Sequence, residues 1–396
     1  MNRNLAVLFF AQMISVCASM VMVTIGGIVG TRLAPDAALA TLPISLMVVG
    51  TAIATIPAAL LMRRIGRRAG SALAALVGAS GILLAALAIE SGSFMLFCAG
   101  IAVFGLNLAF TQQYRFAAAE SVRSDQVGGA ISLVLLGSIG GALVGPLLVS
   151  HGRNWLNGSD YAGTLFALSA LLVVAAALLT LLRNPVVATA ATEHSDGRPL
   201  WTVVCQPHYL LALGGGVVAY GVMSFIMTAT PVSMHVVDGH SMEHTAGVVR
   251  GHVIAMYAPS LVSGWLIGRL GSRIMMLTGS VVMLATVLIG LQGQAVMHYW
   301  FALVLLGIGW NFLYVGATTL LTRTYYPAER FRAQAINDFS VFGCSAAGSL
   351  LAGTVIHLLG WTMLLLVVIA PLLLMLLALI IVRAPPTPAP RAGVAR

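Results

Sequence analysis

Long apolar runs separated by short polar segments make up most of this 396-residue chain. A membrane-spanning helix needs about 20 mostly apolar residues, so each run that reaches this length is a candidate span. We place such helices at 5–30, 39–62, 69–89, 93–115, 126–150, 161–182, 208–234, 245–268, 272–292, 298–321, 332–357 and 361–382. The pattern predicts an all-α membrane protein with twelve transmembrane helices.

The longest polar segment divides these helices into two equal sets. It covers residues 183–207 and contains Glu193, His194, Asp196 and Arg198. We therefore expect a six-helix bundle at 1–182, a cytoplasmic linker at 183–207, a second six-helix bundle at 208–384 and a disordered cytoplasmic tail at 385–396.

The composition requires lipid as the main solvent. Of all residues 59% are hydrophobic and only 8% are charged, and the mean hydropathy is +0.99. Soluble domains carry about 25% charged residues. The first apolar run, 5–30, exceeds the apolar core of about 7–15 residues in a cleaved signal peptide, so we interpret it as the first spanning helix.

The net charge of +9 comes from arginine, because the chain has no lysine. With the N-terminus inside, all arginines except Arg32, Arg153 and Arg250 fall on the cytoplasmic side. Cytoplasmic loops of membrane proteins are enriched in basic residues. The charge therefore indicates topology, with both termini cytoplasmic, and no nucleic-acid partner is expected.

No enzyme signature is found. The glycine run 214–216 lies inside an apolar helix, whereas a phosphate-binding loop lies between a strand and a helix. The four cysteines are scattered, with no C-x-x-C pair. We expect a protein that is not an enzyme.

Two loop segments repeat at a spacing of 205 residues. The sequence A-x-L-x-R-R-x-G-R-R follows the second helix (59–68), and G-x-L-x-G-R-x-G-S-R follows the eighth (264–273). Both resemble the G-x-L-x-D-R-x-G-R loop motif of the major facilitator superfamily, although its Asp is replaced by Arg63 and Gly268. This resemblance implies two bundles that rock about a binding site near the membrane midplane.

Two pairs of soft ligands lie inside predicted helices. Met223 and Met227 share one face of the seventh helix, and His252 and Met256 share one face of the eighth, because residues four apart are neighbours on a helix. The estimated helix centres put Met227 level with His252, and Met223 level with Met256. Thioethers and imidazoles favour Cu(I). The alternative is ordinary packing, since methionine often fills gaps in apolar cores.

The combination resembles the CcoA-type copper importers of the major facilitator superfamily, which carry M-x-x-x-M in helix seven and H-x-x-x-M in helix eight. The resemblance implies that these four residues bind copper during transport. It also implies import across a bacterial inner membrane, with a copper acceptor that supplies assembly of a cbb3-type cytochrome c oxidase. Relatives without the two motifs resemble riboflavin transporters.

A loop after the seventh helix is rich in further soft ligands. His235, His240, Met242 and His244 lie within ten residues on the side opposite the termini. We expect this segment to capture copper and pass it to Met227 and His252. The alternative is an ordinary polar loop.

Other polar residues in the spans are less specific. Asp338, beside Asn337, is expected either to carry a coupling proton or to pair with an arginine at the cytoplasmic mouth, since an acid in lipid usually has a function. Tyr220 and Tyr257 are expected to line the path.

Two rival functions remain open at this point. A transporter of an organic solute, such as a flavin or a drug, predicts an aromatic-rich cavity and indifference to replacement of Met223 or His252. A copper-binding membrane sensor predicts copper binding without transport.

Overall fold

The computed structural model describes residues 2–36, 39, 42–152, 155, 161–183 and 198–382. Within these residues the regular structure is helical, with no β-strand. The first half contains α1 (Arg3–Leu33), α2 (Leu42–Ser91), α3 (Phe94–Thr111), α4 (Tyr114–Glu120), η2 (Ser124–Gln126), α5 (Val127–Gly152) and α6 (Ala162–Leu179). The second contains α7 (Leu200–Val204), α8 (Pro207–Pro231), η3 (Val232–Val237), α9 (Met242–Tyr257), α10 (Ser260–Gly290), α11 (Val296–Leu321), α12 (Arg330–Val367) and α13 (Ile369–Ile381). The predicted tail, 385–396, lies outside the described residues.

Three very long helical segments account for the number of spans. The described residues contain 9 helical segments apolar enough to cross a membrane, and three of these have 50, 48 and 52 residues. A straight helix of 50 residues would be about 75 Å long, more than twice the hydrocarbon thickness. Each breaks at a glycine with positive φ: Gly66 (82°), Gly271 (82°) and Gly360 (74°). Counting the three broken segments twice gives the twelve spans that the hydrophobic pattern predicts.

The turn glycines also confirm the internal repeat. Gly66 and Gly271 occupy matching places in the two repeated loops. Their backbone angles are nearly identical, with ψ of 162° and 159°. A residue with a side chain is strained at such a positive φ, which explains why the repeat has glycine at both positions.

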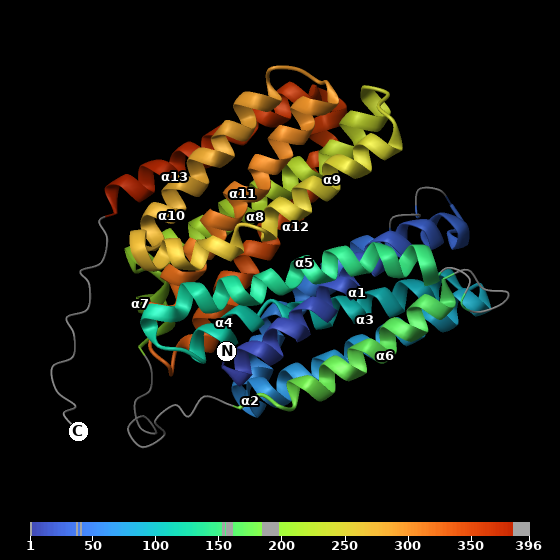
Figure 1. The fold of residues 1–396 in the computed structure, drawn as a ribbon, viewed down its shortest axis with the longest axis horizontal. Coiled ribbons are helices and arrows are strands. Elements are labelled where there is room, and N and C mark those ends of the chain that lie inside the picture. Colours follow the sequence, from blue (N-terminus) through green and yellow to red (C-terminus); the bar gives the residue numbers. More distant parts are fainter. Residues whose placement is uncertain are drawn as a thin grey trace.

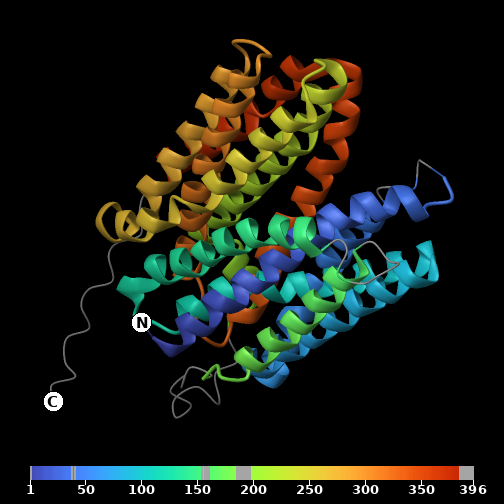
Figure 2. The same ribbon diagram turned by 45° about the vertical axis from the view of Figure 1, so that its right-hand side comes forward.

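The helices form two bundles that meet at one end of the molecule (Figures 1 and 2). The bundle of α1–α6, blue to green, diverges from the bundle of α8–α13, yellow to red, toward the end opposite the label N. The Asn4 side chain donates hydrogen bonds to the Arg183 carbonyl (2.9 Å) and the Ser121 hydroxyl (3.1 Å). The beginning of α1 and the ends of α4 and α6 therefore share the end at which the bundles meet. We call it the arginine-rich end, after Arg3, Arg67, Arg115, Arg198 and Arg330.

The second part of the predicted linker is structured and bound to the second bundle. It forms the short helix α7, and Arg198 pairs with Glu329 through two hydrogen bonds of 2.8 and 2.7 Å. These hydrogen bonds hold the pKa of Glu329 at about 2, so the carboxylate is ionised at neutral pH. Residues 184–197 of the linker lie outside the described residues.

The two bundles approach each other most tightly where α5 meets α10. A Cβ atom on Gly264 would lie 2.5 Å from the Gly129 Cα atom, which is closer than real Cβ contacts. Nearby, the hydroxyls of Ser132 and Ser263 are 3.0 Å apart across the same interface. The bundles can close at this end because Gly264 has no side chain at the point of contact.

We predict that Gly264→Val disfavours closure of the arginine-rich end. Overpacking typically costs about 1–3 kcal/mol, which corresponds to a shift of about 5- to 150-fold in the equilibrium. Ser132→Cys and Ser263→Cys, in a background with Cys17, Cys98, Cys205 and Cys344 replaced by Ser, should form a disulfide that reports closure. Adding Gly264→Val should lower the cross-linked fraction sharply.

The matched control is Gly268→Val, one turn further along α10, where a Cβ atom would meet no atom within 4 Å. Equal cross-linking in the Gly264→Val and Gly268→Val proteins would contradict the assignment of Gly264 as the contact that permits closure.

Candidate functional site

A buried ion pair joins the two bundles near the arginine-rich end. Arg115 of α4 contacts Asp338 of α12, and their side chains are 2% and 0% exposed. Asp338 also accepts hydrogen bonds from Gln113 (2.7 Å) and Asn337 (3.0 Å). A buried charge is tolerated only when it is paired and hydrogen-bonded, and Asp338 meets both conditions through residues of both bundles. Of the two roles expected for Asp338, the structure shows the ion pair with an arginine.

A second polar cluster closes the same end. Arg67, which follows the Gly66 turn, makes two hydrogen bonds of 2.7 and 2.6 Å with Glu120. Arg67 also donates to Gln334 of α12 at 2.7 Å, and Arg330 lies 3.6 Å from Glu120. The repeated loop therefore contacts the opposite bundle, although it lacks the Asp of the family motif.

Five aromatic side chains pack together directly beside this ion pair. We call Tyr220, Tyr257, Trp310, Tyr314 and Phe342 the aromatic group. The Tyr220 ring lies edge-on to Trp310 (5.2 Å between centroids), Tyr314 (4.9 Å) and Phe342 (5.1 Å). Trp310 and Tyr314 are stacked at 5.0 Å, and Tyr257 lies 5.9 Å from Trp310.

The aromatic group lies at the junction of the two bundles. The Arg115 guanidinium carbon of the first bundle is 4.7 Å from the centre of the Tyr314 ring. Helix α5 of the first bundle also packs against α9, which carries Tyr257, and against α11, which carries Trp310 and Tyr314. Two polar atoms of the group, the Trp310 ring nitrogen and the Tyr314 hydroxyl, have no hydrogen-bond partner among the described residues. Buried donors are normally satisfied, so these two unpaired donors make the aromatic group a candidate ligand site.

The proposed copper ligands occupy the neighbouring part of the second bundle. His252 is fully buried, and Met223 and Met256 are 9% and 8% exposed, whereas Met227 is partly exposed. His252 Nδ1 donates a hydrogen bond to the Leu303 carbonyl at 2.8 Å. Its Nε2 atom has no partner among the described residues. A histidine whose Nδ1–H is held by a carbonyl presents the Nε2 lone pair, as metal-binding histidines do.

Although the estimated helix centres put Met227 level with His252, the two helices that carry these residues are not direct neighbours. α11 packs against both α8 and α9, and these two helices do not pack against each other along their length. The His252 ring makes its hydrogen bond to α11. The spacing of residues along a helix and their estimated depth in the membrane define which side chains share a face. They do not determine which other helix packs against that face.

The histidines of the candidate capture loop do not gather into one site. His235 Nδ1 bonds the His240 carbonyl (2.8 Å), and His240 Nε2 bonds the Gln294 carbonyl (2.7 Å). Met242 and His244 lie in the first turn of α9, where the His244 amide donates to Ser241. Among the residues described, no three His, Cys, Asp or Glu side chains are close enough together to hold a metal ion.

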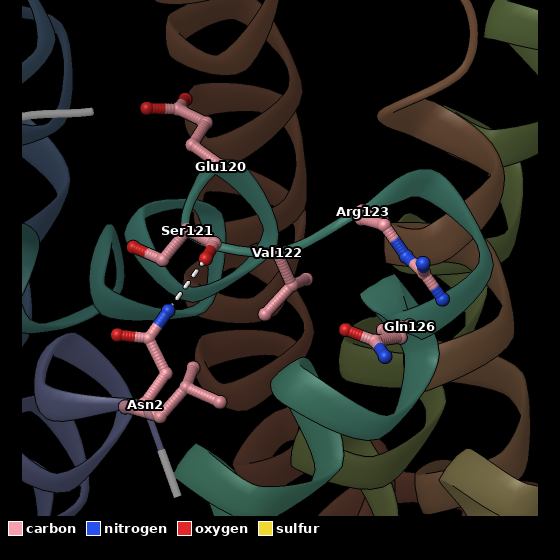
Figure 3. Close-up of a pocket in the computed structure, with 7 residues that line it drawn as sticks. Asn2, Glu120, Ser121, Val122, Arg123 and Gln126 are labelled. Carbon is pink, nitrogen blue, oxygen red and sulfur yellow. Dashed lines mark hydrogen bonds between the residues drawn. The ribbon is translucent and has the colours of Figure 1, made fainter. Parts of the chain in front are cut away.

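A separate pocket of about 460 Å³ opens beside Glu120 at the arginine-rich end (Figure 3). It is lined by Asn2, Leu5, Glu120, Ser121, Val122, Arg123 and Gln126. Its lining comes from the first bundle alone and includes no member of the aromatic group and none of the four candidate copper ligands.

Comparison with known families decides the class of the protein. The profile of the Major Facilitator Superfamily matches residues 8–259 and 245–396. The chain belongs to the major facilitator superfamily. This membership agrees with the two repeated bundles and shows a membrane transporter rather than an enzyme.

Among curated relatives of this superfamily, the Riboflavin transporter RfnT of Brucella anthropi is 40% identical over 361 residues, covering 91% of this chain and 90% of the relative. The uncharacterized MFS-type transporter YddS of Bacillus subtilis is 27% identical, covering 92% and 87%.

Solved structures of major facilitator proteins share the fold. FucP in the outward conformation superposes with a TM-score of 0.75 at 15% identity, covering 95% of this chain and 97% of that one. The human organic anion transporter MFSD10 gives 0.75 at 14%, covering 95% and 99%. A bacterial homologue of the iron transporter ferroportin with soaked iron gives 0.71 at 14%, covering 95% and 98%.

Sequence reasoning missed several residues of this site. Arg115 was assigned only to the topology signal, because it ends an apolar run. Trp310, Tyr314 and Phe342 lie inside apolar runs, where single aromatic residues give no separate signal. The signal that could have drawn attention to Arg115 was its place within an unusually polar helix end, after Gln112 and Gln113.

We predict that Asp338→Asn destabilises the protein strongly. Breaking a buried ion pair by removing one partner costs about 3–5 kcal/mol, so the unfolding midpoint of the purified protein in detergent should fall clearly. Replacing both partners, with Arg115→Met and Asp338→Leu, should restore much of the loss.

Asp125→Asn is the matched control, because Asp125 pairs with Arg123 where the two side chains are 63% and 77% exposed. Such surface pairs contribute about 0–1 kcal/mol. An Asp338→Asn protein as stable as the Asp125→Asn protein would contradict the structural role of the buried pair.

Proposed function

We propose that this major facilitator protein transports a planar organic solute of the flavin type, with riboflavin as the representative substrate. The observation that carries this proposal is the aromatic group at the junction of the two bundles. Flat ring systems stack on tyrosine and tryptophan at little entropic cost. The 40% identity to a riboflavin transporter over most of both chains points to the same class of solute.

The unpaired polar atoms of the aromatic group support a heteroaromatic ligand. Trp310 and Tyr314 each offer a hydrogen-bond donor in a buried, apolar setting. The ring carbonyls and nitrogens of a flavin accept such bonds. A purely hydrocarbon ring would leave both donors unpaired, at a cost of about 1–3 kcal/mol each.

The arrangement of charges supports transport by alternating access. The two bundles are joined at the arginine-rich end by polar contacts that include Arg115–Asp338 and Arg67–Gln334. Opening this end requires those contacts to separate. We further propose that proton binding to Asp338 weakens its attraction to Arg115 and couples opening to a proton gradient. We place the arginine-rich end on the cytoplasmic side of a bacterial inner membrane.

One observation favours a second function, the import of copper. His252 Nε2 is buried and unpaired, Met256 supplies a thioether on the same helix, and Met223 and Met227 supply thioethers on α8. This donor set suits Cu(I). In that case His235, His240, Met242 and His244 would deliver copper to the site, and the copper would serve cytochrome oxidase assembly.

We predict that Tyr220→Leu lowers riboflavin uptake about tenfold in cells that express matched amounts of protein, because Tyr220 contacts three other rings and each aromatic pair contributes about 0.5–1.5 kcal/mol. The measurement is accumulation of radiolabelled riboflavin. Phe301→Leu is the control, because Phe301 is on α11 but is 46% exposed and outside the aromatic group. Equal uptake by the two variants would argue against flavin transport through this group.

A second prediction concerns the candidate copper ligands, whose replacement should leave riboflavin uptake almost unchanged. The double variant Met227→Ala, His252→Ala should keep riboflavin uptake within about twofold of the wild type, because neither side chain belongs to the aromatic group. Radioactive copper uptake is measured in the same cells. Copper uptake by the wild type that disappears in the variant, without any riboflavin uptake, would make copper import the function and reject the flavin proposal.

A further inference from the structure

The helices α8 and α12 carry side chains that meet in a regular series. Gly216 faces Val341, Tyr220 packs on Phe342, Ser224 hydrogen-bonds Ser345 and Thr228 hydrogen-bonds Ser349. Successive members of the series are four residues apart on α8, and four residues rise about 6 Å along a helix. The two helices therefore build a ladder in which one aromatic rung is followed by two hydroxyl rungs.

The hydroxyl rungs are short and direct. The Ser224 and Ser345 oxygens are 2.5 Å apart, and those of Thr228 and Ser349 are 2.9 Å apart. Each hydroxyl has one donor hydrogen and two acceptor lone pairs. Pairing uses one hydrogen and one lone pair, so each rung keeps one O–H donor and three lone pairs for another partner.

The face of α12 that carries the ladder begins at a contact with the other bundle. Asp338, Phe342, Ser345 and Ser349 recur at intervals of four, three and four residues, which places them on one face of the helix. Asp338 at the foot of this face contacts Arg115 of the first bundle. The aromatic and hydroxyl rungs continue that face away from the arginine-rich end. Toward the opposite end of the molecule the two bundles diverge (Figure 2).

The hydroxyl rungs are accessible although they belong to spanning helices. Ser224, Ser345 and Ser349 are half-buried and Thr228 is exposed. Polar side chains within a membrane span normally face a bundle interior or an aqueous path rather than lipid. Their place above the aromatic rung is therefore consistent with a ligand that enters between the bundles.

We propose that this ladder is a binding subsite for a ligand composed of a planar heteroaromatic ring and an attached polyhydroxylated chain. The ring packs against Tyr220 and Phe342, and the hydroxyls of the chain bond the Ser224–Ser345 and Thr228–Ser349 rungs in turn. The subsite rests on the proposed flavin transport and deepens it, because it separates flavins by their side chain. Riboflavin carries such a chain, whereas lumiflavin has the same ring with a methyl group in its place.

The test is the affinity of the purified protein for riboflavin and for lumiflavin, measured by titration calorimetry. The variant Ser345→Ala, Ser349→Ala removes one hydroxyl from each rung. Each lost hydrogen bond lowers affinity about two- to tenfold, so riboflavin should bind about 4- to 100-fold more weakly. Lumiflavin affinity should stay within about twofold, because its ring contacts are unchanged.

Two further variants test whether the effect is specific to the rungs. Ser224→Ala, Thr228→Val changes the opposite side of the same rungs and should reproduce the selective loss. Ser80→Ala, Thr180→Val removes two hydroxyls that bond carbonyls of their own helical segments, at Val77 and Ala177, and should leave both affinities unchanged. Retained lumiflavin binding shows that each variant is folded.

The outcomes separate this inference from the function on which it rests. Riboflavin and lumiflavin affinities that fall equally, or that both stay unchanged in the two ladder variants, would overturn the subsite and leave flavin transport standing. A wild-type protein that binds neither flavin would overturn both. A selective loss for riboflavin in both ladder variants would establish that the rungs bind the polyhydroxylated chain.

Discussion

The buried contact between Arg115 and Asp338 is the constraint on which the rest of this structure depends. It joins α4 to α12, so it fixes the two bundles against each other at the arginine-rich end. Neither charge can be exposed to lipid without a large cost. The same guanidinium lies over the Tyr314 ring, so closure of that end and the position of the aromatic group are linked through one side chain.

This link gives a physical basis for alternating access. A ligand that stacks in the aromatic group lies beside the residues that must separate for the arginine-rich end to open. Ligand binding, or a proton on Asp338, can therefore shift the equilibrium between the state with this end closed and the state with this end open. The shift requires that the ligand or the proton binds the two states with different affinity. The close backbone approach of Gly129 and Gly264 makes closure geometrically possible, while the polar clusters make it favourable.

Much of this architecture could be predicted from the sequence, because span length, arginine bias and loop repeat are local signals. Gly66 and Gly271 are clear examples, since a turn position with positive φ favours glycine in any fold. The pairing of Arg115 with Asp338 could not be predicted, because the two residues are 223 positions apart in the sequence and lie in different bundles. Likewise, the positions of Met227 and His252 on their helices could be derived, but the intervening α11 could not.

The most direct test of flavin transport by alternating access is counterflow in proteoliposomes that contain only this protein. Vesicles are loaded with unlabelled riboflavin and diluted into a trace of labelled riboflavin, so that exchange through the protein needs no external driving force. The account predicts transient accumulation of label in loaded vesicles and none in vesicles loaded with buffer. No accumulation of labelled riboflavin, together with counterflow of labelled copper in copper-loaded vesicles, would contradict it.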